Sequence, residues 1–281
     1  MKKLRFLHIP KTAGSTFARI LRNQYRGRPF FTFSGNNPRD KEKFSVLSQA
    51  EKEATCLFIG HAPIVSGIKE ADMVPIITFL REPVSRVKSF CQYVAVGKSN
   101  TYLRKKFPPE TFDLDEFLDS GYSELSNLQS RMLINYEKEG ADLLIASLDP
   151  EQIILKALDN LYNKVSCYGL QERFDESLML FTKQFGWSTP YYEYVNRKTK
   201  NSLLVFEDRH IQKINELNLI DLEFYKAAKS RFDKTFESDE QSRIKCANFK
   251  RAQKVTSPLL KLYGDTGRYI KRGYRMALRK G

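Results

Sequence analysis

The N-terminal half of the chain alternates between two patterns of hydrophobic residues. Short apolar runs at 4–9, 55–60 and 75–80 are rich in strand-forming residues. The first and third runs are each followed by a segment with apolar residues at helical spacing, over 17–25 and 84–94. Because strands that alternate with helices assemble into parallel sheets, the pattern predicts an α/β fold with a central parallel sheet and flanking helices.

The rest of the chain has a mainly helical pattern. Helices are expected over 127–136, 150–160, 172–185 and 222–236, with one further strand at 164–170. Residues 26–43 are rich in Gly, Pro, Asn and charged residues, so we expect a loop there. This loop is either a wall of a substrate site or a solvated connection.

Polar residues follow three of the predicted strands. Lys11 comes just after the first strand, His61 after the second and Arg81 after the third. The carboxyl ends of parallel strands meet at one edge of a sheet, where open α/β sheets bind their ligands. We therefore expect these three side chains to converge on one site.

The segment PKTAGST, between the first strand and its helix, has the composition of an anion-binding turn. Free backbone N–H groups at such a turn bind phosphate or sulfate, and Gly14 allows close approach. Lys11 adds positive charge, and Thr12, Ser15 and Thr16 add hydroxyl donors. The lysine precedes the glycine, unlike in the Walker A pattern, which disfavours an ATPase. Taken alone, the segment is also explained as a capped helix start without a ligand.

A second segment, LREPVSRVKS, points to another anion contact. Arg81 ends a predicted strand, and Ser89 lies eight residues later, about two turns into a helix that Pro83 helps to start. The two side chains could hold one anion between them. This second motif strengthens the ligand-binding interpretation of the first.

Together the two segments resemble the sulfotransferases that use 3'-phosphoadenosine-5'-phosphosulfate (PAPS), in the branch of heparan-sulfate O-sulfotransferases and their bacterial relatives. HIPKTAGSTF is similar to the family's 5'-phosphosulfate loop, and Arg81 with Ser89 to its 3'-phosphate site. Further similarity lies in GHAP, NLQSRML, GLQERFDESLMLF, VNRKTK and residues 221–232, so the resemblance covers roughly 1–240. It implies a P-loop-like nucleotide-binding fold.

The resemblance also implies roles for individual residues. Lys11 would contact the bridging oxygen and the sulfuryl group of PAPS, and Arg81 and Ser89 would hold the 3'-phosphate. The 5'-phosphate would lie among four residues of the loop: Thr12, Gly14, Ser15 and Thr16. The product nucleotide would be 3',5'-ADP.

His61 corresponds to the family's catalytic base, a histidine in a Gly-His context just after a strand. Its ordinary pKa of about 6.5 leaves a neutral fraction that can accept a proton near pH 7. Lys11 stays cationic and would stabilise the leaving group electrostatically, so the scheme needs no metal ion.

Other polar residues have structural interpretations. We expect His8 to be a core residue inside the first strand, and we place neither it nor His210 in the active site. Glu172 and Asp175 are expected to form structural salt bridges rather than an acid-base pair. Four basic residues either close over the nucleotide or form structural ion pairs: Arg131, Arg173, Arg197 and Lys198.

Basic residues are concentrated at the C-terminus. Residues 246–281 contain ten Lys or Arg and one acid, Asp265, so they carry +9 of the chain's net charge of +14. We therefore expect a sulfotransferase domain over 1–245 and a basic tail over 246–281. From Ser257 onward a helix would suit an anionic membrane surface, whereas a solvated tail is the alternative because three glycines weaken a helix. Nucleic-acid binding is a weaker option.

The cysteines and the hydropathy bear on the compartment. The four cysteines are widely separated and form no zinc-binding pattern, which favours a reducing compartment: Cys56, Cys91, Cys167 and Cys246. No apolar run approaches the ~18 residues of a membrane span, and the opening segment lacks the apolar core of a signal peptide. We expect a cytoplasmic enzyme, peripheral at the inner membrane face if the tail binds there.

The sequence thus predicts a sulfotransferase that transfers a sulfuryl group from PAPS to a hydroxyl acceptor, which the family branch suggests is a glycan. Two alternatives stay open. An ATP-dependent small-molecule kinase lacks support because no Walker lysine and no metal-binding acid after a strand are found. A non-catalytic binding protein for an anionic polymer or a membrane would rest on the basic tail.

Overall fold

The computed structural model describes residues 2–35, 37–134, 148–193 and 204–257. Within them five strands form one sheet in the order β2-β3-β1-β4-β5, with every neighbouring pair parallel. The strands are β1 Leu4–Leu7, β2 Phe30–Phe33, β3 Leu57–Gly60, β4 Ile76–Leu80 and β5 Val165–Leu170. The predicted α/β class with a central parallel sheet is confirmed.

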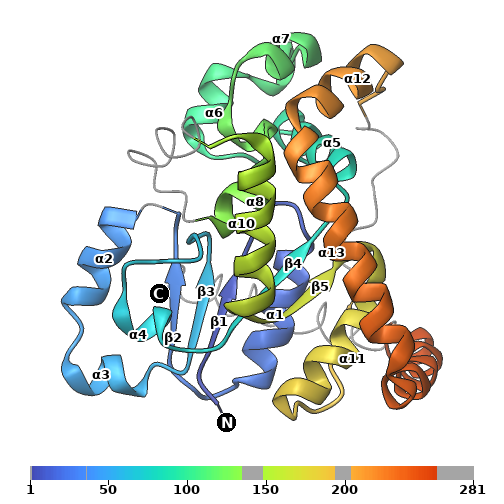
Figure 1. Ribbon diagram of the computed structural model, residues 1–281. Helices are drawn as coiled ribbons and strands as arrows, with labels where there is room; N and C mark the ends of the chain where they lie inside the picture. The colour runs from blue at the N-terminus through green and yellow to red at the C-terminus, as the bar shows by residue number, and fades with distance from the viewer. Residues whose placement is uncertain (1, 36, 135–147, 194–203, 258–281) are drawn as a thin grey trace, which may run out of the picture.

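Helices cover both faces of this sheet (Figure 1). On one face lie α1 (Gly14–Gln24) and α11 (Phe174–Phe185), whose Phe17 and Phe181 rings have centroids 5.1 Å apart. On the other face lie α10 (Pro150–Asn163) and α13 (Leu219–Ser238), and Tyr168 of β5 donates a hydrogen bond to the Ala228 carbonyl of α13. The sheet is therefore buried between two helical layers, as parallel sheets require.

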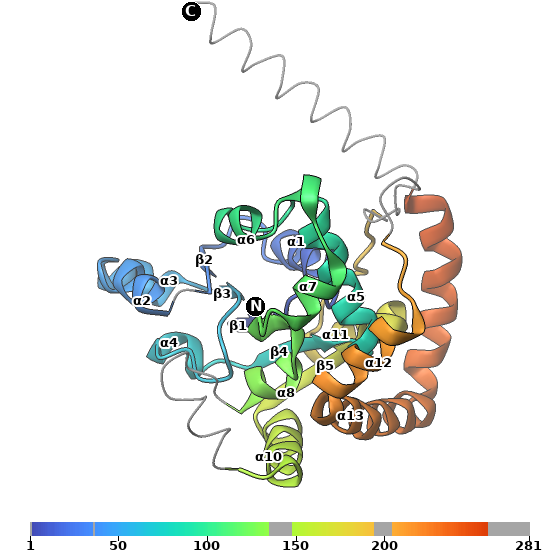
Figure 2. The same ribbon diagram turned by 90° about the horizontal axis from the view of Figure 1, so that it is seen from above.

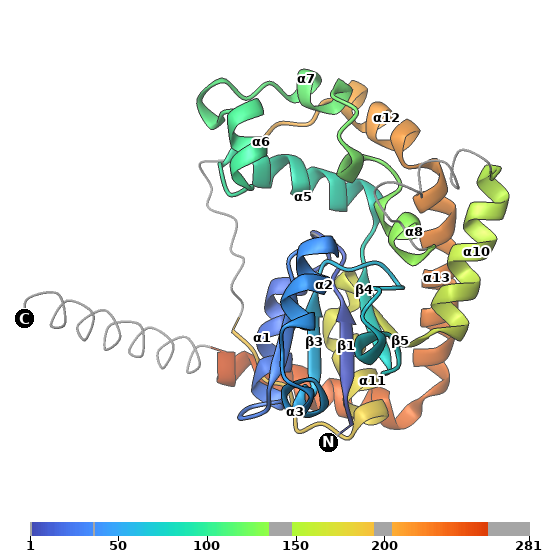
Figure 3. The same ribbon diagram turned by 90° about the vertical axis from the view of Figure 1, so that its left-hand side faces the viewer.

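A helical lobe lies beyond the carboxyl ends of the strands (Figure 3). It consists of α5 (Pro83–Ala95), α6 (Thr101–Lys106), α7 (Leu114–Asp119) and α12 (Asp208–Leu217). The lobe has its own hydrophobic cluster, in which Phe90 of α5, Phe117 of α7 and Ile214 of α12 are buried. Because this cluster is separate from the main core, the lobe is held above the sheet edge as a packed unit.

The remaining described helices are shorter. They are α2 Asn37–Ser45, α3 Gln49–Ala54, α4 Lys69–Asp72 and α8 Leu128–Leu133, with 3₁₀ turns at Pro109–Thr111, Ser123–Leu125 and Gln171–Arg173. In the view from above, α8 lies on the same side of the sheet as α10 (Figure 2). None of the described helices is long and apolar enough to cross a bilayer.

The loop expected over 26–43 was wrong in part, because the segment contains β2 and the start of α2. The Phe33 side chain is buried against Phe44 and Phe58, and this packing makes β2 an edge strand of the sheet. A four-residue apolar run between segments rich in Gly and Pro gives a weak sequence signal. The tertiary contacts decide its conformation.

The boundary expected between residues 245 and 246 falls inside a helix over 240–257. Cys246 and Phe249 of this helix belong to the main hydrophobic core. Gln253 is fully buried and exchanges hydrogen bonds with the backbone of Tyr192. This part of the expected tail is thus packed on the domain, and 258–281 lies outside the described residues.

Candidate active site

The loop between β1 and α1 has an unusual backbone. Lys11 and Ala13 have φ of 70° and 68°, in the left-handed region that non-glycine residues seldom adopt. The Thr12 hydroxyl is buried and donates to the Ile9 carbonyl at 2.8 Å, so its hydrogen closes the loop rather than pointing to a ligand. The loop between β1 and α1 has six residues, 8–13, and two of them are in this region, which indicates that the surroundings hold the loop in one conformation.

The first turn of α1 is open for an anion. Its N-cap, Ala13, has no side chain that can accept from the helix, and the first turn contains no acidic residue. Ser15 is exposed and Thr16 is half-buried. These residues therefore present N–H groups and hydroxyls at the positive end of an eleven-residue helix.

Gly14 is required by a neighbouring side chain. A Cβ atom placed on Gly14 would lie 1.8 Å from Nε2 of His8. The His8 ring therefore lies directly on the first residue of α1. His8 was expected inside the first strand, but β1 ends at Leu7 and the histidine lies beside the loop. It lies beside His61 rather than inside the first strand.

Arg81 joins the second motif to the first. Its Nη1 donates to the Lys11 carbonyl at 3.0 Å, so the two segments are in direct contact. Its own backbone is clamped by the Gln129 side chain, which accepts from Arg81 N at 2.9 Å and donates to Arg81 O at 2.7 Å. Nε of Arg81 is buried and has no hydrogen-bond partner among the described residues. That N–H is available for an anion.

Helix α5 carries Ser89, but the backbone amides at its N-terminus are not free to bind an anion. The Glu82 carboxylate accepts from the backbone N–H groups of Val84 and Ser85, so those helix amides are already satisfied. An anion here would meet side chains instead. Ser89 is half-buried on α5, and no hydrogen bond joins it to Arg81 in the part of the chain that the structure describes.

The Lys11 ammonium lies against α5. Its Nζ is 4.2 Å from the ring centroid of Tyr93, which lies one turn beyond Ser89 on the same helix face. Burial lowers the pKa of Lys11 to about 8, and the positive charges of Arg81 and Lys98 act in the same direction. The clustering of cations around a partly buried ammonium indicates that this site is built for negative charge.

His61 follows β3 and contacts His8 twice. Its Nδ1 is 2.8 Å from the His8 carbonyl, and the two imidazole rings are stacked with centroids 4.3 Å apart. A carbonyl can only accept, so Nδ1 carries the hydrogen and Nε2 keeps its lone pair. Burial lowers the pKa of His61, partly offset by this hydrogen bond and by Glu124. The ring is therefore neutral near pH 7 in the tautomer of a base.

Gln129 is itself positioned by α13. The Asp221 carboxylate accepts from the backbone N–H groups of Gln129 and Ser130 at 2.9 and 2.8 Å, and from the Ser130 hydroxyl at 2.6 Å. Asn127, at φ 44°, starts α8 and accepts from the Asp221 N–H. A chain of contacts thus runs from α13 through α8 to the Arg81 backbone.

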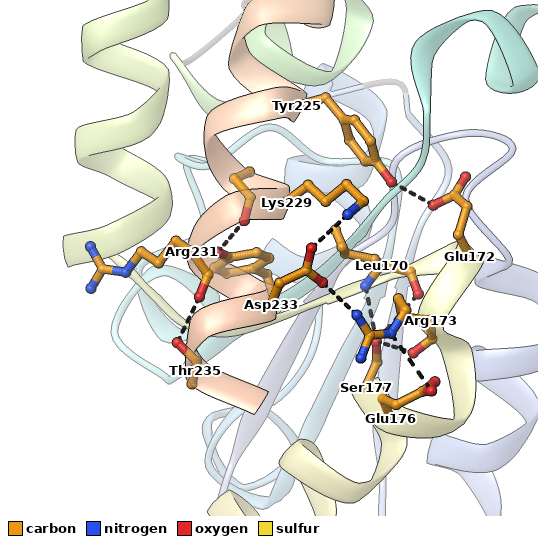
Figure 4. Close-up of polar contacts among 12 residues, drawn as sticks. Leu170, Glu172, Arg173, Glu176, Ser177, Tyr225, Lys229, Arg231, Asp233 and Thr235 are labelled. Atoms are coloured by element: carbon orange, nitrogen blue, oxygen red, sulfur yellow. Dashed lines mark hydrogen bonds and ion pairs between the residues drawn. The ribbon is translucent and has the colours of Figure 1, made fainter. Parts of the chain in front are cut away.

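Several charged residues considered from the sequence have polar partners within the protein, among them Glu172 and Arg173 (Figure 4). Arg173 pairs with Asp233 and Glu176, and Glu172 accepts from the Tyr225 hydroxyl at 2.8 Å. Asp175 accepts from the Tyr192 hydroxyl, and Arg131 donates to the Ser123 and Ser126 carbonyls. Arg197 and Lys198 lie outside the described residues. The salt bridges expected for Glu172 and Asp175 are thus not found among the described contacts, and tyrosine hydroxyls hold both carboxylates instead.

Two residues beside the predicted ones, Tyr93 and Gln129, were not predicted from the sequence, and His8 was expected elsewhere. Tyr93 lies four residues after Ser89 on a predicted helix, so helical spacing could have indicated it. No sequence signal shows that Gln129 clamps Arg81, because the two residues are 48 positions apart.

Comparison with known proteins gives relatives of one kind, although no protein-family model matches. The chain is 27% identical to heparan-sulfate 6-O-sulfotransferase 2 of Gallus gallus over 88% of its length and 71% of the relative's. It is 27% identical to the Homo sapiens heparan-sulfate 6-O-sulfotransferase 2 over 88% of this chain and 47% of that protein. For heparan-sulfate 6-O-sulfotransferase 1 of Cricetulus griseus the identity is 28%, over 84% and 68%. The chain thus spans between about half and seven tenths of these relatives.

Among solved structures, the chain is similar to mouse sulfotransferase SULT7A1 complexed with PAP. The identity is 14% and the TM-score 0.40, over 76% of this chain and 63% of the other.

Proposed function

From its place among the PAPS-dependent sulfotransferases, we propose that this chain transfers the sulfuryl group of PAPS to a carbohydrate hydroxyl and releases 3',5'-ADP. The observation that carries the proposal is the hydrogen bond from Arg81 to the Lys11 carbonyl. It brings two anion-binding motifs together at the sheet edge where His61 also lies. A donor with phosphates at both its 3' and 5' positions matches this pair of motifs.

Donor binding divides between the two motifs. The open first turn of α1 and the Lys11 ammonium would hold the 5'-phosphosulfate, with hydroxyls from Ser15 and Thr16. Thr12 would contribute its backbone N–H, because its hydroxyl is used by Ile9.

The 3'-phosphate would lie on Arg81 and Ser89. The buried Nε of Arg81 would then gain the acceptor that it lacks. Since Glu82 already satisfies the amides at the start of α5, selectivity for the 3'-phosphate depends on these two side chains.

His61 and Lys11 would perform the transfer. Nε2 of His61 takes the proton of the acceptor hydroxyl while its oxygen forms a bond to sulfur. The bond between sulfur and the bridging oxygen breaks, and that oxygen leaves with 3',5'-ADP carrying the electron pair. Lys11 stabilises the negative charge that develops on it. Within the described residues no cluster of His, Cys, Asp or Glu could hold a metal ion.

The acceptor class comes from the relatives, whose names specify heparan sulfate and its 6-O position. For this chain we propose the broader class, a glycan hydroxyl.

We propose further that the enzyme is cytoplasmic and attaches peripherally to the inner membrane face. The described cysteines are all free thiols. Helix 240–257 packs one face on the domain and exposes basic residues beside two apolar ones, Ile244 and Val255. Cosedimentation with vesicles of anionic lipid at low salt tests this, and protein that stays in the supernatant would refute it.

The test of the main proposal is calorimetry with four nucleotides, followed by an activity assay. We expect PAPS and 3',5'-ADP to bind with similar affinity and both far more tightly than 5'-AMP or ATP. Transfer of labelled sulfate from PAPS to a panel of glycans then establishes the reaction. Preferential binding of ATP with magnesium would favour a kinase, and binding of none of the four would favour a non-catalytic protein.

A further inference from the structure

The two histidines of the site form a stacked pair rather than two separate groups. Their ring centroids are 4.3 Å apart, with an interplanar angle of 29°. The backbone carbonyl of His8 also contacts Nδ1 of His61. His8 therefore touches the proposed base through its ring and through its main chain.

The His8 ring is fixed on its other sides. It stacks on Phe6 with centroids 5.3 Å apart and an angle of 16°. Gly14 leaves the space that its Nε2 occupies, since a Cβ there would overlap the ring. Phe6 in turn packs edge-on against Phe17 of α1, with centroids 4.9 Å apart. Residues of β1 and α1 thus fix the position of the His8 ring.

The pair has a defined charge state. Burial lowers the pKa of His8 to about 3, and the charges of His61 and Lys11 act in the same direction. His8 is therefore neutral whenever the site works. For His61, burial lowers the pKa, whereas the hydrogen bond to the His8 carbonyl and the charge of Glu124, from the turn Ser123–Leu125, raise it. Because the His8 ring is neutral, the base His61 lies beside an uncharged partner.

We infer that His8 is a positioning residue for His61: its ring, wedged between Phe6 and Gly14, sets the plane of the His61 imidazole and directs Nε2 to the acceptor hydroxyl. The inference rests on the proposed function for the identity of the reaction. In this role the His8 ring transfers no proton and contacts His61 through its flat face. An aromatic ring without nitrogen should therefore be able to replace the His8 imidazole.

The experiment compares His8→Phe with His8→Ala in the full chain. We expect His8→Ala to lower kcat by about 10- to 100-fold, the scale for a misplaced catalytic group, while 3',5'-ADP still binds. His8→Phe should recover most of kcat because it restores the stack. If His8→Ala turns over at the wild-type rate, or if His8→Phe is as slow as His8→Ala, the inference is wrong.

Two further readouts separate positioning from folding and from the reaction itself. In His8→Ala, water replaces the ring, so the His61 pKa measured by NMR should rise toward its ordinary value of 6.5. In His8→Phe it should stay low. An unchanged His61 pKa in His8→Ala would overturn the inference even in a protein without sulfotransferase activity. Wild-type protein that transfers no sulfate would refute the proposed function but would leave this measurement valid.

Discussion

The Arg81 side chain donates a hydrogen bond from Nη1 to the backbone carbonyl of Lys11 at 3.0 Å. The two residues are 70 positions apart and follow different strands, yet the bond joins the two segments that we propose to bind anions. It also occupies the oxygen of a residue in the left-handed region, which helps to hold the loop in that conformation. A change at Arg81 should therefore affect both segments.

Replacing Arg81 with Ala should remove most of the preference for 3',5'-ADP over 5'-AMP. A hydrogen bond to a charged group contributes about 1.5–3 kcal/mol, so we expect a loss of about 10- to 150-fold in 3',5'-ADP affinity by calorimetry. Arg243→Ala, at an exposed position on helix 240–257, is the control with the same change of net charge. An Arg81→Ala protein that still prefers 3',5'-ADP would place the 3'-phosphate elsewhere.

Replacing His61 with Ala should lower turnover by about 10²–10⁴-fold, the usual contribution of a general base, while nucleotide affinity is kept.

Replacing Lys11 with Ala should have a different effect from His61→Ala, since the Lys11 charge acts on the donor both before and during transfer. It should weaken PAPS binding as well as slow the reaction. Single-turnover sulfation at saturating PAPS measures the first effect and calorimetry the second. A His61→Ala enzyme with wild-type turnover would exclude His61 as the base.

The activity should depend on pH through Lys11 and His61, with opposite signs. The pKa of His61 lies below its ordinary value of 6.5, so as pH falls through it the base gains a proton and kcat/KM drops. As pH rises through about 8, Lys11 in the enzyme without bound PAPS loses its charge, and kcat/KM for PAPS drops again. Lys11→Arg, which stays charged, should lose the alkaline limb. An alkaline limb that survives in Lys11→Arg would belong to another group.

Gly14→Ala should destabilise the fold through His8. The Gly14 backbone is not in the left-handed region, and Ala favours a helix, so the cost comes from the added Cβ against the His8 ring. Overpacking of this kind costs about 1–3 kcal/mol in the free energy of unfolding. In a His8→Ala background the same change should be neutral or stabilising. Equal costs of Gly14→Ala in both backgrounds, measured by denaturant unfolding, would contradict this coupling.

The sequence by itself determined the parallel sheet and the residues that end its strands. Periodicity located β1, β3, β4 and β5 because short buried strands between amphipathic helices leave a strong local pattern. It also placed Lys11, His61 and Arg81 at one sheet edge, since parallel strands point the same way. Both results depend only on residues near one another in the chain.

The tertiary structure decided what depends on contacts between distant residues. β2 forms because Phe33 packs against Phe44 and Phe58, although its flanks resemble a loop. The His8 ring lies beside His61 because Gly14 leaves room for it. The Thr12 hydroxyl donates to the Ile9 carbonyl within the loop, because the loop conformation brings the two residues together. Side-chain partners are set by packing across the fold, and no local pattern in the sequence encodes them.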